Sequence, residues 1–155
     1  MARAKKNTYK SLRDDPSGKI IAVPHYVLNS LAYKSLSGNA VRLFIDLFMQ
    51  YNRANNGKLI ASINFMEKHR GWTSSTTLNR AIKELIDKGL IAKTVQGHMP
   101  NKASWYAICC FALNDIPDLD ITPREFPRGQ YAHWKPLSHP LSQPIANPKV
   151  VNAKL

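Results

Sequence analysis

The chain has 155 residues, with 22 Lys or Arg against 10 Asp or Glu, so its formal net charge is +12. This length suggests one domain with tails, and an apolar fraction of 44% can build one core. No stretch approaches the roughly 18 consecutive apolar residues of a membrane span, and no apolar segment of a secretory signal follows the basic N-terminus. We therefore expect a cytoplasmic protein with no membrane partner. A positive surplus of this size attracts polyanions, which makes nucleic acid the expected partner.

Residues 1–18 are polar and basic and end in Pro16-Ser-Gly18. We expect a flexible arm, because this segment has too little apolar surface to pack. Arg3, Lys5 and Lys6 are its candidate contacts with phosphate groups. A solvated tail without a binding role fits the same residues equally well.

Hydrophobic periodicity predicts short elements between residues 19 and 60. We expect a strand at 19–23 and a helical segment at 24–33, since Pro24 suits a first helical turn. A longer helix is predicted at 39–52, with Ser37 as N-cap and Asn55-Asn-Gly57 as its end. Apolar residues recur along it at helical spacing: Ala40, Val41, Phe44, Leu47, Phe48 and Tyr51. Residues 58–60 form a candidate short strand.

The strongest pattern is a helix over 74–88 that follows a shorter helix at 62–69 and a tight turn at 71–73. Thr73 or Ser74 supplies the N-cap, and Gly89 stops the helix. Its buried stripe consists of Leu78, Ala81, Ile82, Leu85 and Ile86. Trp72 is expected to pack against the start of this helix as a hydrophobic staple.

A β-hairpin is predicted next, with strands at 90–96 and 103–113 and a turn-rich loop at 97–102. Cys109 and Cys110 are adjacent on the second strand, so their side chains point to opposite faces. We expect buried, reduced thiols here, without a disulfide or a metal.

Beyond Asn114 the periodicity fails, and prolines recur through the rest of the chain. We expect residues 114–155 to be a Pro-rich extension, partly disordered, in which 136–155 is extended. Leu137, Leu141 and Ile145 recur every four residues, which fits either a spacer or a strip that contacts a second subunit or another protein. Trp134 is unexplained by the core and either docks on the domain or anchors a partner.

The order of helix, turn, helix and hairpin resembles the winged helix-turn-helix domains of bacterial regulators and of phage and plasmid replication proteins. The stretch from Glu84 to Ile91, Glu-Leu-Ile-Asp-Lys-Gly-Leu-Ile, resembles the join between recognition helix and wing in those families. The resemblance covers residues 37–113. It implies an α+β winged-helix domain at 19–113, with its core at 37–113, that binds double-stranded DNA.

The helix at 74–88 carries the main candidate site. Opposite its apolar stripe, at about 100° per residue, lie Thr76, Arg80 and Lys83, with Asn79 at their margin. Arg can pair with guanine and Asn with adenine in a major groove, and hydroxyl groups near the helix start, here Ser74 and Ser75, can meet phosphate. The alternative is an ordinary solvated helix face. Asp87 favours this alternative, because its carboxylate would repel phosphate.

The hairpin adds weaker candidates for contacts with the minor groove or backbone. They are Lys93, His98, Asn101 and Lys102. Any hairpin exposes polar residues at its tip, so solvation explains these residues as well as binding does.

No catalytic motif is found in the sequence. The five histidines lack metal-ligand spacing, and no Gly-rich phosphate loop or nucleophile motif occurs. Asp115, Asp118 and Asp120 lack the glycine and glutamate of a calcium loop. We expect no enzymatic activity, no metal and no cofactor.

Three functions remain, in order of preference. The first is sequence-dependent binding of double-stranded DNA, by a transcriptional regulator or an accessory replication protein of a phage, plasmid or similar element. The second is a protein-interaction module or phage-type inhibitor built on a winged helix. The third is RNA binding, which the charge allows without any RNA-binding signature. A homodimer and a protein partner for the C-terminal tail stay open.

Overall fold

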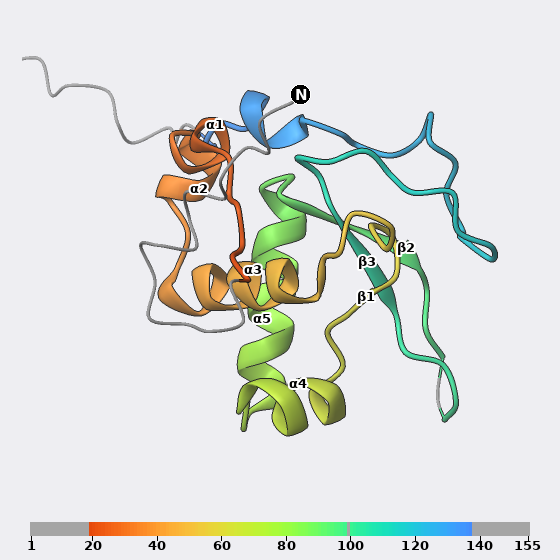
Figure 1. Ribbon diagram of the computed structural model, residues 1–155. Coiled ribbons are helices and arrows are strands. Elements are labelled where there is room, and N and C mark those ends of the chain that lie inside the picture. Colours follow the sequence, from red (N-terminus) through yellow and green to blue (C-terminus); the bar gives the residue numbers. More distant parts are fainter. Residues whose placement is uncertain (1–18, 99, 138–155) are drawn as a thin grey trace, which may run out of the picture.

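The computed structural model describes residues 19–98 and 100–137 (Figure 1). The expectations for the arm, including Arg3, Lys5 and Lys6, and for residues 138–155 lie outside these ranges. Within them the chain is α+β, with five α-helices and a three-stranded antiparallel sheet. The predicted α+β class is confirmed.

The chain before residue 37 differs from the prediction in two ways. Residues 19–23 form no strand, and they lie instead along the end of the next long helix, beside Phe48 and Met49. The helical segment divides into α1 (His25–Leu28) and α2 (Leu31–Lys34). It divides because Ser30 is extended and its hydroxyl caps α2 by accepting a hydrogen bond from Tyr33 N at 3.2 Å.

Helix α3 (Gly38–Gln50) begins at the predicted cap, since Ser37 Oγ accepts a hydrogen bond from Ala40 N. Its predicted end is wrong. The helix stops at Gln50 because Tyr51 is extended. Asn56 does not cap this helix and forms hydrogen bonds with the sheet instead. The buried Asn56 side chain accepts from Ile108 N at 2.7 Å and donates to Ile108 O at 3.0 Å, where a neighbouring strand would do the same.

Helices α4 (Ile63–Arg70) and α5 (Ser75–Asp87) agree with the prediction. Ser62 and Ser74 cap them through their hydroxyl groups. Gly71 ends α4 with a φ of 68°, and Gly89 follows α5 with a φ of 72°, both in the left-handed region that favours glycine. Figure 1 shows α3 lying across α5, with the sheet beside both helices.

The sheet has the order β1-β3-β2, formed by β1 (Leu59–Ile60), β2 (Ile91–Val95) and β3 (Trp105–Ile108). Strands β2 and β3 make the predicted hairpin. Strand β3 is shorter than the predicted 103–113, because the chain turns after Ile108, where the Asn56 side chain occupies the ladder. Within the hairpin loop, a pair of backbone hydrogen bonds joins His98 and Lys102 as an isolated antiparallel bridge.

The hydrophobic core continues past residue 113. Phe126 and Tyr131 are buried in it, and Trp134 packs against it. Tyr131 belongs to a short 3-10 helix, η2 (Gln130–His133), which contacts α2. The backbone at Gln130 and Tyr131 comes so close to Gly89 that a Cβ there would lie 2.9 Å from Tyr131 N. The chain therefore stays packed against the domain as far as Trp134.

Candidate nucleic-acid interface

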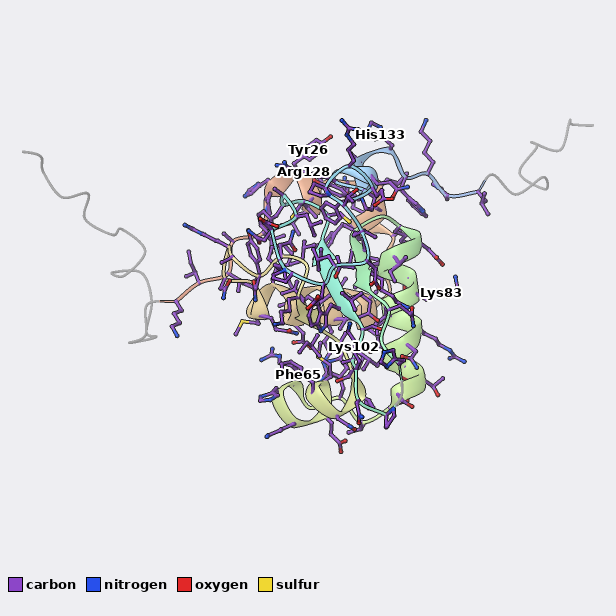
Figure 2. The ribbon with its side chains drawn as sticks, turned by 90° about the vertical axis from the view of Figure 1, so that its right-hand side faces the viewer. Tyr26, Phe65, Lys83, Lys102, Arg128 and His133 are labelled. Atoms are coloured by element: carbon purple, nitrogen blue, oxygen red, sulfur yellow. The ribbon has the colours of Figure 1, made fainter. Side chains whose placement is uncertain are left out.

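The two faces of α5 differ sharply in exposure. Leu78, Ala81 and Leu85 are buried, and the helix packs against α3. The six predicted site residues on this element are all exposed: Ser74, Ser75, Thr76, Asn79, Arg80 and Lys83. Figure 2 shows Lys83 pointing away from the molecule on the outer side of α5.

The hydroxyl groups at the start of α5 are not equivalent. Ser74 Oγ accepts a hydrogen bond from Thr77 N at 3.2 Å, so this side chain is committed to capping the helix. Ser75 and Thr76 make no side-chain hydrogen bond with another described residue. Their hydroxyl groups are free to bond an external acceptor close to the positive end of the helix dipole.

The charged residues of α5 are mostly paired. Lys83 forms an ion pair with Asp87 one turn along the helix, and Lys88 forms another with Glu84 at 3.0 Å. Arg80 has no carboxylate partner among residues 19–98 and 100–137. Its guanidinium group is therefore the cation on this face that can bind an anion without first breaking an ion pair.

Asn79 and Arg80 are consecutive residues of α5, about 100° apart around its axis, and they border different hollows. Asn79 borders a hollow of about 210 Å³ with Ser62, Ser104 and Tyr106, between the start of α4 and the hairpin. Arg80 borders a different hollow, of about 300 Å³, beside Ser37 at the start of α3. The structure therefore aims these two candidates in different directions.

The hairpin presents its candidates less openly. Lys93 is exposed and donates to Gln96 Oε1 at 3.0 Å, while His98 and Asn101 are exposed near the tip. Lys102 is half-buried, with its Nζ 5.7 Å from the centre of the Trp105 ring. Figure 2 places Lys102 near the end of the molecule that carries α4 and Phe65.

Lys58 is a further cation at this hairpin that the sequence did not suggest. Its Nζ lies 4.9 Å from the centre of the Trp105 ring. The contact arises because β1 pairs with β3, with Ile60 opposite Trp105. The sequence alone does not show this long-range pairing, so it indicated Lys58 only as the start of a short strand.

The turn between α4 and α5 is held by the buried carboxylate of Asp46 on α3. Asp46 accepts hydrogen bonds from Arg70 Nε at 2.6 Å and from Trp72 Nε1 at 2.7 Å. Arg42 lies over the Trp72 ring at 4.6 Å and donates to the carbonyl groups of Arg70 and Gly71. The polar contacts of the Trp72 side chain with described residues are thus with α3, and the staple on α5 that the sequence suggested stays a prediction. Its role in fixing the position of α5 remains structural.

A second contact fastens α5 to the start of α3. Glu84 accepts hydrogen bonds from Ser37 N at 2.9 Å and from Ser37 Oγ at 2.6 Å. Burial raises the pKa of the Glu84 carboxyl, but the hydrogen bonds from Ser37 and Lys88 outweigh burial and hold this pKa below its usual value. Lys88 also donates to Ser35 O at 2.7 Å, so the end of α5 is fixed to the α2–α3 connection.

The two cysteines lie in the interior of the fold, Cys109 buried and Cys110 half-buried. Cys109 and Cys110 are free thiols, and burial raises the pKa of each to about 12.

Among the acidic residues after the hairpin, Asp120 accepts a hydrogen bond from Gln96 N at 2.6 Å. In the described part of the chain, no group of three or more His, Cys, Asp or Glu is placed to hold a metal ion. No helix in those ranges is both long and apolar enough to cross a membrane.

Comparison with protein-family models, with curated proteins and with solved structures finds no match to this chain. Function is therefore inferred from the geometry of α5 and its surroundings.

Proposed function

We propose that the chain is a winged helix-turn-helix protein that binds double-stranded DNA, with α5 as the recognition helix and the β2–β3 hairpin as the wing. The observation that carries this proposal is the outer face of α5. It exposes hydroxyl, amide and guanidinium groups, and Arg80 has no carboxylate partner among the described residues. The order of α3, β1, α4, α5 and the hairpin supports it, since that order is the one expected of a winged helix.

In this proposal α5 enters the major groove, which is wide enough for one α-helix. Arg80 pairs with guanine O6 and N7, and Asn79 pairs with adenine N6 and N7. Ser75 and Thr76, near the helix start, bond phosphate oxygens. The wing places Lys93, His98 and Asn101 against the neighbouring backbone, where they add affinity without reading sequence.

The contacts of Asp46 and Glu84 support a recognition helix that is held rigidly. Both carboxylates fasten the α4–α5 unit to α3 through hydrogen bonds. A recognition helix that keeps its angle loses little conformational entropy when it binds, so more of the contact energy contributes to affinity.

The direct test is selection of bound fragments from random duplex DNA, followed by titration of the enriched duplex. We expect one enriched sequence, bound with an affinity that falls steeply as salt rises. Binding of single-stranded RNA in preference to the duplex would support RNA binding instead. If neither nucleic acid binds, the protein-interaction module becomes the better account. A palindromic sequence would also report a homodimer, because half-site symmetry mirrors protein symmetry.

The biological role within DNA binding is proposed only on the resemblance noted from the sequence. A transcriptional regulator and an accessory replication protein of a mobile element would use the same face of α5. Mapping the enriched sequence to a promoter or to a replication origin separates these two roles.

A further inference from the structure

The C-terminal part of the described chain runs beside α5 and forms a groove with it. The groove has a volume of about 760 Å³. Arg80, Lys83 and Lys88 line it on the helix, and Trp134, Lys135 and Leu137 line the opposite wall. In Figure 2 the chain after His133 leaves on the same side of the molecule as Lys83.

The opposite wall is anchored to the fold by Trp134. Trp134 packs against the core, and Lys88 Nζ lies 5.2 Å from the centre of its ring. The preceding residue of the core, Tyr131, is 5% exposed, and its backbone lies against Gly89. Trp134 therefore keeps its position beside the end of α5 without any partner present, and the exposed residues 135–137 continue the wall from this anchor.

The groove carries positive charge on both walls and apolar surface on the wall formed by residues 134–137. Four cationic side chains and two carboxylates line it, so its net charge is +2. The carboxylates of Glu84 and Asp87 pair with Lys88 and Lys83. The two cations left without a carboxylate among the described residues are Arg80 and Lys135, one on each wall. Trp134, Pro136 and Leu137 supply apolar surface between them.

A DNA strand has the complementary chemistry, because its phosphates are anionic and its deoxyribose rings present apolar faces. Arg80 is also a residue of the outer face of α5, so the groove continues the surface that would enter the major groove. A strand that borders the major groove on one side of α5 would thus pass directly over Lys135.

We propose that the groove between α5 and residues 134–137 holds the sugar–phosphate backbone of this bordering strand, with Lys135 contacting a phosphate. This inference rests on the proposed function and extends the DNA-binding surface to the C-terminal segment. Lys135 then contributes affinity and salt dependence but no sequence preference.

The first test compares Lys135→Gln with wild type on the enriched duplex at several salt concentrations. We expect the slope of log affinity against log salt to fall by about 1 in magnitude, because one phosphate contact is lost. The enriched sequence should stay the same. Arg124→Gln is the matched control, since it removes one exposed positive charge that does not line the groove. It should leave the slope unchanged.

The second test uses Trp134 as a reporter inside the groove. In a Trp105→Phe protein the remaining indoles are Trp134 and Trp72, and Trp72 is 2% exposed and inaccessible. Quenching by acrylamide, which is uncharged, then reports access to Trp134. We expect bound duplex to reduce this quenching severalfold.

The outcomes separate the groove from the proposed function. An unchanged slope for Lys135→Gln, or a Trp134 that stays open to acrylamide in the complex, overturns the groove while DNA binding by α5 stands. A Trp134 that is protected in the free protein and opens on binding also overturns it, because another occupant then fills the groove first. If the wild-type protein binds no duplex, the proposed function itself is wrong.

Discussion

The indole Nε1 of Trp72 donates a hydrogen bond of 2.7 Å to Asp46 Oδ2, and this contact joins the α4–α5 turn to helix α3. Trp72 is 2% exposed and Asp46 is 3% exposed, so neither group can replace the bond with bulk water. Arg70 compensates the buried carboxylate through its Nε at 2.6 Å. The angle at which α5 leaves the turn therefore depends on one buried side chain of α3.

Replacing Asp46 should destabilise the protein in two steps. Asp46→Ala leaves the buried Trp72 N–H without an acceptor, and we expect a loss of about 2–3 kcal/mol in the free energy of unfolding. Asp46→Asn keeps one acceptor oxygen but removes the ion pair with Arg70, so a loss of about 1–2 kcal/mol is expected. Urea denaturation measures both. Losses below about 0.5 kcal/mol for both variants would contradict this account of the turn.

A glycine series tests the packing of η2 against the end of α5. Gly89→Ala meets both a left-handed φ of 72° and the backbone of Tyr131, and we expect a loss of more than about 2 kcal/mol. Gly129→Ala has a φ of 76° and open space, so strain alone should cost about 1 kcal/mol. Gly38→Ala, helical and in open space, should be neutral or slightly stabilising.

The comparison of these glycine variants needs only thermal or urea unfolding. If Gly89→Ala and Gly129→Ala lose the same stability, the close approach of residues 130–131 to Gly89 does not constrain the fold. If Gly38→Ala is as damaging as either, the whole series fails to report local packing.

The elements with strong periodicity were predictable from the sequence. Helix α5 follows from its apolar stripe, its Ser74 cap and Gly89, and all three are present. The same holds for the start of α3 at Ser37. These signals are local, since each lies within one helix and its flanking residues, so the sequence alone contains them.

The contacts that position the site were not predictable. Asp46 and Trp72 are far apart in sequence, and nothing local indicates that they bond. Asn56 resembled a helix terminator because Asn tolerates that position, yet its amide completes the end of β3. The packing of Phe126, Tyr131 and Trp134 was hidden because the surrounding prolines remove any helical or strand period.

The Cys109 thiol should make stability depend on alkaline pH. Burial raises its folded-state pKa to about 12, while a thiol in an unfolded chain ionises near pH ~8.5. The unfolded state therefore loses its proton first, so stability is full below that pH and declines as pH rises towards 12. We expect wild type to lose about 1 kcal/mol per pH unit more than Cys109→Ala between pH 9 and 11. Parallel curves for the two proteins would show that the thiol does not contribute.

Asn79 and Arg80 should read different positions of the DNA site, because they point about 100° apart around α5 and border different hollows. Alanine at either residue should weaken specific binding by about 1–3 kcal/mol and relax preference at one base pair. Selection from random duplex with each variant identifies the relaxed position. Equal weakening on every sequence would make both residues phosphate contacts instead.

The most direct test of DNA binding through α5 is a titration of enriched duplex against wild type and Arg80→Ala, repeated over a range of salt concentrations. For wild type we predict specific binding whose log affinity falls linearly with log salt, by several units of slope. For Arg80→Ala we predict a loss of about 1–3 kcal/mol on the enriched sequence with little change on unrelated duplex. Affinity for the enriched sequence that is the same in both proteins, or no salt-dependent binding by wild type, would contradict the account.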